Sequence, residues 1–64
     1  MKSNIKKLCG EKDMSIYQLA KDAGLTYEAV RRYERKGLNK AYFGCMVKIA
    51  NALDCKLEDL YEEE

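Results

Sequence analysis

Hydrophobic and polar positions follow one another along the chain with a period close to the roughly 3.6 residues of an α-helical turn. Between residues 16 and 35, apolar residues recur every three or four positions, and charged or polar residues stand between them. The same spacing is present in 5–12 and, over a broader apolar face, in 42–53. The pattern therefore predicts an all-α fold in which short amphipathic helices pack around one core.

The apolar positions of these segments are expected to face inward. Among them, the small side chains of Ala20 and Ala23 would let a neighbouring helix approach closely. The residues expected in the core, in chain order, are Ile5, Leu8, Cys9, Leu19, Ala20, Ala23, Ala29, Val30, Tyr33, Phe43, Met46, Val47, Ile49, Ala50 and Leu53.

Capping residues mark the boundaries of the two central helices. Ser15 and Gln18 fit the S-x-x-Q capping box, in which each side chain bonds to the other's backbone N–H. Thr26 is a second N-cap residue eleven positions later. Between the two caps, Gly24 can adopt the left-handed conformation that ends a helix. This spacing is typical of a helix-turn-helix motif.

The second of these helices, 27–35, would leave a charged face exposed. This face carries Glu28, Arg31 and Arg32. Arginine bonds bidentately to guanine and glutamate accepts from the cytosine amino group, so these side chains suit base reading. The alternative is an ordinary solvated face of an amphipathic helix. The helix by itself does not favour base reading over solvation.

The order of several features resembles the Cro/CI-type helix-turn-helix regulators, also called the Xre family. The resemblance covers 5–60 without a gap. The features that carry it are Leu19, Ala20, Gly24, Thr26, Val30, Glu34, the run MVKIANAL at 46–53 and the run LEDL at 57–60. It implies a compact fold of five short helices, with helix-turn-helix at the second and third and the fifth near 57–61. It also implies that the third helix reads DNA in the major groove.

The resemblance assigns roles to particular residues. Base edges would be read by Thr26, Tyr27, Glu28, Arg31 and Arg32, with Arg32 as the principal guanine reader. Phosphates would be held by Ser15, Tyr17, Arg35, Asn39 and Lys40, for which plain solvation is the alternative. Leu57 and Tyr61 would form a dimer interface, for which closure of the core is the alternative.

The sequence departs from the family pattern at several positions. Cys9 replaces the first-helix arginine that usually pairs with the carboxylate at Glu34. Ile16 stands where a polar residue, commonly Gln, often contacts DNA. Asp54 replaces a terminating glycine, and the proline expected near Ala41 is missing. In the loop 36–40, Gly37 is the expected positive-φ residue, and Asn39 is a candidate cap for the fourth helix.

Charge is distributed unevenly along the chain. Residues 1–40 carry ten Lys or Arg and five Asp or Glu, a balance of +5, whereas residues 41–64 carry two and six, a balance of −4. A basic end can neutralise phosphates, and an acidic end would face away from DNA. We interpret the acidic tail 62–64 as a solubilising terminus.

Composition limits the classes of function. Residues 1–64 are enough for one domain and too few for a large catalytic cleft, so we expect no enzyme. With no histidine and no C-x-x-C spacing, we expect no metal, no cofactor and no small-molecule substrate. Cys9, Cys45 and Cys55 are expected to be buried free thiols, the last two being more open to adventitious oxidation. No apolar stretch reaches the roughly 20 residues that span a bilayer, so no membrane contact and a cytoplasmic location are expected.

These observations predict a sequence-specific, double-stranded-DNA-binding transcriptional regulator, most simply a repressor. Useful specificity needs two copies on half-sites, through a weak homodimer or through assembly on DNA. The alternative is a protein-binding module on the same fold, antitoxin-like or anti-repressor, supported by the aromatic and apolar side chains of Ile16, Tyr17 and Tyr27. Salt dependence distinguishes the two, because DNA binding falls steeply as salt rises.

Overall fold

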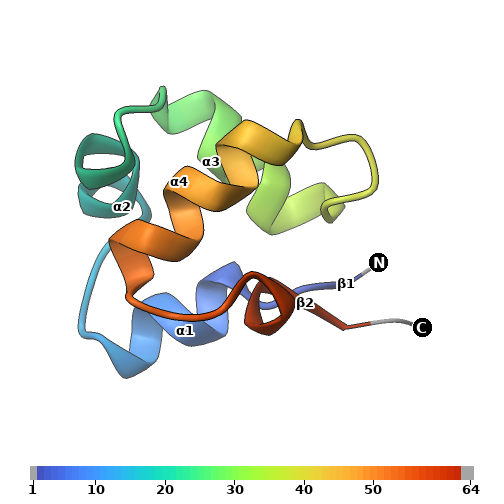
Figure 1. Ribbon diagram of the computed structural model, residues 1–64. Coiled ribbons are helices and arrows are strands. Elements are labelled where there is room, and N and C mark those ends of the chain that lie inside the picture. Colours follow the sequence, from blue (N-terminus) through green and yellow to red (C-terminus); the bar gives the residue numbers. More distant parts are fainter. Residues whose placement is uncertain (1, 63–64) are drawn as a thin grey trace.

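The computed structural model describes residues 2–62 and contains four α-helices, one short 3₁₀ helix and two short strands (Figure 1). In chain order the elements are β1 (Lys2–Ser3), α1 (Ile5–Glu11), α2 (Ile16–Ala23), α3 (Tyr27–Lys36), α4 (Phe43–Leu53), η1 (Leu57–Leu60) and β2 (Tyr61–Glu62). The expected four α-helices are present close to their predicted boundaries. In residues 2–62 no helix is both long and apolar enough to cross a membrane.

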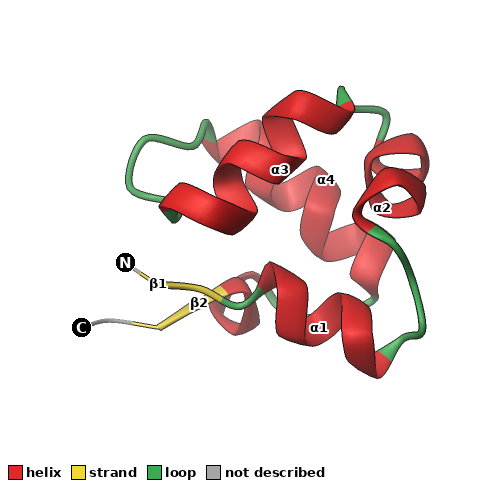
Figure 2. Ribbon diagram, turned by 180° about the vertical axis from the view of Figure 1, so that it is seen from behind, coloured by secondary structure: helices red, strands yellow, loops and turns green. Residues whose placement is uncertain are grey.

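The helices pack around α4. This helix lies against α2 on one side and η1 on the other, and α3 packs on α2 and α1 (Figure 1). From behind, α3 lies in front with α2 beside it and α1 below (Figure 2). One side of α3 is therefore left open along the length of the helix.

The core contains most of the residues expected there. The residues with the lowest exposure are Ile5, Leu19, Val30, Leu38, Ile49, Leu53 and Leu60. Leu38 is only 1% exposed. The sequence did not predict this burial, because Leu38 lies in the loop after α3 and so outside the helical spacing of apolar residues. Its burial fixes the loop that carries Asn39 and Lys40 on the outer surface.

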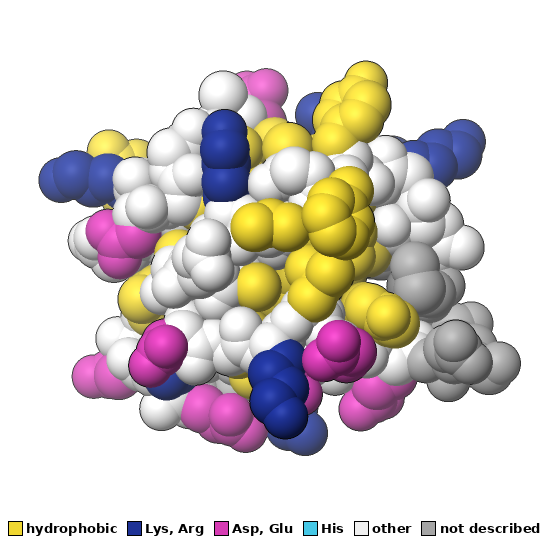
Figure 3. Space-filling model, in the orientation of Figure 1, with side chains coloured by type: hydrophobic (Ala, Val, Ile, Leu, Met, Phe, Trp, Pro, Cys, Tyr) yellow, Lys and Arg dark blue, Asp and Glu magenta, His cyan; other side chains and the backbone are white. Residues whose placement is uncertain are grey.

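Two expected core residues lie outside the core. Phe43 is 68% exposed at the start of α4, and Val47, one turn later, is only half-buried. The apolar stripe of α4 is wider than the surface that α2, α3 and η1 cover, so its outer edge reaches solvent. Apolar side chains gather over α4 and the C-terminal segment in Figure 3.

The helix-turn-helix forms with the predicted caps. Ser15 Oγ accepts from the Gln18 backbone N–H at 3.0 Å, and Thr26 Oγ1 accepts from that of Ala29 at 3.2 Å. Gly24 ends α2 in the left-handed conformation, with φ 72° and ψ 29°. The predicted second half of the capping box is wrong, because the Gln18 amide donates forward to Asp22 Oδ1 at 2.8 Å.

The connections on either side of α4 differ from expectation. Gly37 has the expected positive φ of 88°, with extended ψ of −178°. The N-cap of α4 is Tyr42, so Asn39 lies outside the capping position. At the other end, Asp54 takes the left-handed conformation itself, with φ 52°, in place of the glycine that the family prefers.

The fifth helix is a single 3₁₀ turn rather than an α-helix. Asp59 stabilises its start by accepting from the Lys56 backbone N–H at 3.2 Å. Tyr61, expected in this helix, instead begins β2 and pairs antiparallel with Ser3 of β1. The Asn4 N–H donates to the Leu60 carbonyl at 2.8 Å, so the segments before α1 and after η1 are joined. Of the predicted acidic tail 62–64, Glu62 lies in β2 and positions 63–64 lie outside the described residues.

Candidate nucleic-acid interface

At the starts of α2 and α3, the hydroxyl group that caps each helix lies at the surface. Ser15 and Thr26 are both exposed, and each uses one oxygen lone pair for its cap. A hydroxyl group has one donor and two acceptor sites, so each retains an O–H to donate. Backbone N–H groups and the positive dipole end of each helix add to this environment. Both starts can therefore bind an anion such as a phosphate.

An aromatic contact joins α2 to α3 next to these starts. The rings of Tyr17 and Tyr27 have centroids 6.3 Å apart and planes tilted by 46°. Tyr17 is 67% exposed and Tyr27 39% exposed. The two helices thus share an exposed aromatic surface, one ring from each.

Tyr27 also holds an arginine on its own helix. Arg31, one turn further along α3, donates from Nη1 to the Tyr27 hydroxyl at 2.8 Å. Its Cζ lies 5.9 Å from the centroid of the Tyr27 ring, within the range of a cation–π contact. The guanidinium is therefore oriented before any ligand is bound, while its other N–H groups can still donate.

The outer face of α3 continues as a shallow basic groove of about 360 Å³. Its lining residues are Glu28, Arg31, Arg32, Arg35 and Lys36. All of them are exposed, and four of the five are positively charged. Val30 and Tyr33 face the opposite way into the core, so packing leaves this charged face free. The expected division of α3 into an inner and an outer face is confirmed.

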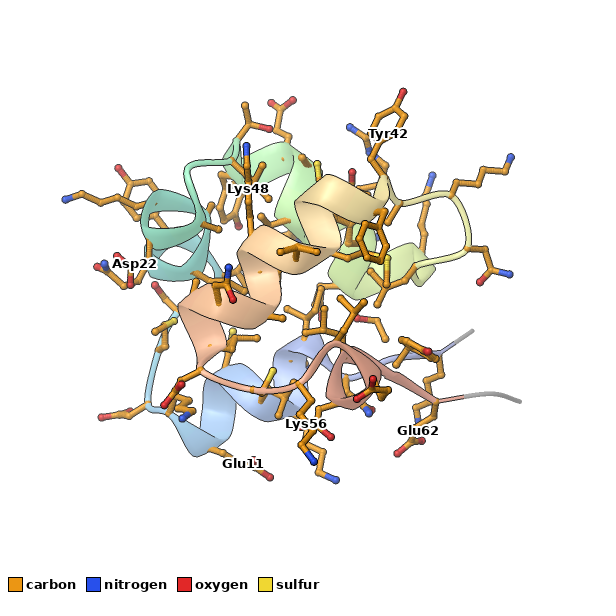
Figure 4. All side chains as sticks on the ribbon, in the orientation of Figure 1. Glu11, Asp22, Tyr42, Lys48, Lys56 and Glu62 are labelled. Carbon is orange, nitrogen blue, oxygen red and sulfur yellow. The ribbon has the colours of Figure 1, made fainter. Side chains whose placement is uncertain are left out.

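A second groove, of about 430 Å³, lies between the end of α3 and the loop before α4. It is lined by Arg32, Tyr33, Lys36, Gly37, Asn39, Lys40, Ala41 and Tyr42. The structure thus brings Arg32 together with Asn39 and Lys40, which lie apart in the sequence. The ring of Tyr42 is 77% exposed and projects from the start of α4 (Figure 4).

A third groove, of about 830 Å³, lies where the end of α3 meets α1 and β1. It is lined by Lys2, Ser3, Asn4, Lys6, Lys7, Gly10, Glu34, Arg35, Lys36, Gly37 and Glu62. Glu34, which lacks its usual arginine partner on the first helix, is half-buried here among lysines.

Two of the cysteines, Cys9 and Cys55, have thiols whose pKa is raised. Burial raises the pKa of the Cys9 thiol above its ordinary value, and the Glu34 carboxylate raises it further. Burial also raises the pKa of Cys55, with Asp59 adding to the effect. A thiol with a raised pKa stays protonated at neutral pH and is a poor nucleophile. Cys9 is buried as expected, whereas Cys45 and Cys55 are only half-buried.

Most of the predicted DNA-contacting residues lie on one continuous surface. The Tyr17, Tyr27 and Arg31 side chains form one chain of contacts, and Arg31 shares the outer groove of α3 with Arg32. Ile16 differs from expectation. It is half-buried against the core, which removes it from the exposed apolar group that supported a protein-binding role.

Two residues of this surface, Lys36 and Tyr42, were not predicted from the sequence. Lys36 lines all three grooves, and its spacing of four residues from Arg32 along α3 was a signal for it. No sequence pattern indicated Tyr42, because the exposure of its ring depends on where the loop before α4 places the start of that helix. The dimer candidates Leu57 and Tyr61 line none of these grooves and are half-buried against the core.

Comparisons with known proteins agree with this geometry. The family model described as the Cro/C1-type HTH DNA-binding domain matches residues 4–64. The chain is 36% identical over 58 residues to the SPbeta prophage-derived uncharacterized HTH-type transcriptional regulator YopS of Bacillus subtilis (strain 168), covering 91% of this chain and 78% of that protein. The fold is similar to the N-terminal DNA binding domain of SinR from Bacillus subtilis, with a TM-score of 0.81, 27% identity, and coverage of 94% and 87% of the two chains.

Proposed function

Since the chain belongs to the family of Cro/C1-type helix-turn-helix DNA-binding domains and is a DNA-binding transcriptional regulator, we propose that it reads its operator with the outer face of α3 in the major groove. An α-helix fits the major groove of B-DNA, where each base pair presents a distinct set of donors and acceptors. The observation that supports this proposal most directly is the orientation of Arg31 by Tyr27 on an exposed, basic helix face.

Five residues read bases in this proposal. They are Thr26, Tyr27, Glu28, Arg31 and Arg32. Arg32 is the principal guanine reader, Glu28 accepts from a cytosine amino group, and the Thr26 hydroxyl retains a donor after capping the helix. Arg31 binds a neighbouring base or phosphate from the position in which Tyr27 holds it.

Phosphate contacts set the register of α3 on the duplex. The residues proposed for this role are Ser15, Tyr17, Arg35, Asn39 and Lys40. Ser15 and Tyr17 lie at the start of α2, whereas Lys40 lies in the loop after α3, so the contacts flank the reading helix at both ends. When α3 is held at both ends by contacts to the DNA backbone, it enters the major groove in one orientation.

Repression by occlusion is the mechanism that needs least from so small a domain. One helix covers only a few base pairs, so two copies on half-sites about 34 Å apart would give the needed specificity. The surface that we propose for their contact is the outer side of α4, with Phe43 and Val47, together with the adjoining η1 and β2, with Leu57 and Tyr61. Phe43 is the most exposed of these four residues.

Selection from random duplex DNA at moderate salt tests the proposal. We expect a palindromic site to be enriched. On that site, Arg32→Ala should lose about 1–3 kcal/mol of binding free energy and relax the sequence preference. Lys40→Ala should weaken binding to all sequences and reduce the slope of log K against log salt by about one unit.

Two results would contradict the proposal. One is a pool that never converges on a sequence. The other is an Arg32→Ala protein that binds the selected site as the parent does. Binding to a protein partner with no salt dependence, and no binding to DNA, would favour a protein-binding module instead.

A further inference from the structure

Apart from Arg35, the residues that line the groove between α1 and the end of α3 have no part in the DNA contacts proposed above. The sequence places Lys2, Lys6 and Lys7 about thirty residues from Arg35 and Lys36, and only the packing of β1 and α1 against α3 brings the two groups together. The lining contains five lysines and arginines and two glutamates, a balance of +3. Folding thus adds the charges of Arg35 and Lys36 to those of the three lysines in the N-terminal segment.

This groove is continuous with the outer face of α3. Arg35 and Lys36 line both, and Lys36 also lines the groove beside the loop before α4. Together the three grooves contain eight lysines and arginines against three glutamates, a balance of +5. The remaining described residues carry four lysines against six acidic side chains, a balance of −2. One continuous basic band therefore extends from Lys40, past the reading face, to the start of α1.

The chemistry of the lining favours a polyanion over a protein partner. Every lining residue is Lys, Arg, Glu, Ser, Asn or Gly, so the groove offers no apolar or aromatic anchor. Protein interfaces depend on such anchors at their centres. A groove of about 830 Å³ is also far larger than one phosphate group, and it is open to solvent along the band. These properties suit successive phosphates of a nucleic-acid backbone.

We propose that this groove holds phosphates of the duplex that flank the half-site read by α3, with Lys6 and Lys7 as the principal contacts. The inference rests on the proposed function, because α3 must first enter a major groove. Lys6 and Lys7 are both exposed on α1, and their long side chains can reach a backbone that passes the end of α3. The C-terminal end of α3, where the helix dipole is negative and disfavours an anion, also lies at this groove. The positive charges of the lysines are therefore needed for a phosphate to bind there.

A charge-removal pair tests the proposal. The variant is Lys6→Gln with Lys7→Gln, and the matched control is Lys48→Gln with Lys56→Gln. The control removes the same charge from lysines that project from α4 and from the segment before η1, outside all three grooves (Figure 4). All four side chains are exposed, so both proteins should retain the fold, which circular dichroism checks.

Binding is measured over a range of salt concentrations on two duplexes with the same selected half-site, of roughly 12 and 30 base pairs. On the long duplex, Lys6→Gln with Lys7→Gln should reduce the slope of log K against log salt by about two units. On the short duplex it should change the slope little, because the flanking phosphates are missing. The control pair should leave both slopes close to those of the parent.

Three results would overturn the proposal. They are an unchanged slope in the Lys6 and Lys7 variant, an equal reduction in the control, and an equal reduction on both duplexes. A parent protein that binds neither duplex would instead overturn the proposed function, so the two failures are distinguishable.

Discussion

At the scale of single residues, the reading face depends on one tyrosine. Tyr27 contacts the Tyr17 ring on α2 and also accepts a hydrogen bond from Arg31 on its own helix. An arginine already held in one conformation loses less side-chain entropy on binding than a free one. If the proposed contacts are made, Tyr27 acts on recognition through Arg31 as well as through its own contacts.

Removing the Tyr27 hydroxyl should weaken specific binding. Tyr27→Phe keeps the ring, and so keeps the contact with Tyr17, but deletes the acceptor of the 2.8 Å bond from Arg31. A hydrogen bond of this kind contributes roughly 0.5–1.5 kcal/mol, so affinity for the selected site should fall by about two- to tenfold. Binding to mixed-sequence DNA should change much less. Titration by fluorescence anisotropy measures both.

Tyr61→Phe is the matched control, because it makes the same chemical change at a residue that lines none of the three grooves. Equal affinities of Tyr27→Phe and Tyr61→Phe for the selected site would show that the hydroxyl does not orient Arg31 for binding.

At the scale of helices, the C-terminal ends of α2 and α4 are fixed by backbone conformation. Gly24 and Asp54 both end a helix with positive φ, of 72° and 52°. Glycine adopts this conformation without strain, whereas a residue with a Cβ atom is disfavoured there. The tight turn at Gly24 sets the angle between α2 and α3, and therefore the position of the reading face.

Two identical substitutions should have opposite effects on stability. A Cβ atom at Gly10 or Gly24 would meet no atom within 4 Å, so packing is not affected at either site. Gly24→Ala should destabilise the fold by about 1–2 kcal/mol because φ is positive. Gly10→Ala, inside α1, should stabilise it by about 0.5–1 kcal/mol. Urea unfolding measures both, and a shift of the two midpoints in the same direction would disprove the explanation.

At the scale of the whole molecule, charge and apolar surface are separated. The basic band follows α3, its adjacent loop and α1. Apolar side chains gather instead over α4 and the C-terminal segment (Figure 3), the elements that carry Phe43, Val47, Leu57 and Tyr61. A protein that holds DNA on one surface and a second copy on another needs this kind of separation.

Removing the exposed apolar side chain of the proposed contact surface should abolish contact between copies. Phe43→Ser should abolish self-association of the protein in sedimentation experiments at high concentration. Two copies of this variant should then bind the two half-sites of a palindromic duplex independently. Phe43 is chosen over Leu57 because it is 68% exposed and so contributes little to folding. Tyr42→Ser, at the neighbouring position, where the side chain is 77% exposed, is the control in DNA-free sedimentation. Cooperative filling that persists in Phe43→Ser would exclude this surface as the interface.

The sequence by itself determined the local features of this protein. The spacing of apolar residues predicted the four α-helices, and the caps at Ser15 and Thr26 and the glycine at position 24 predicted the helix-turn-helix. These features were predictable because each depends on residues within one or two helical turns. The exposed charges of α3 followed from the same periodicity.

Only the tertiary structure decided features that depend on residues distant in the chain. It buried Leu38 in a loop, left Phe43 exposed beside a covered stripe, and paired Tyr61 with Ser3 in a strand instead of a helix. It also brought the lysines of α1 to the end of α3. Periodicity gives the direction of a side chain from its own helix, but the neighbour that covers it is fixed only when all elements pack together.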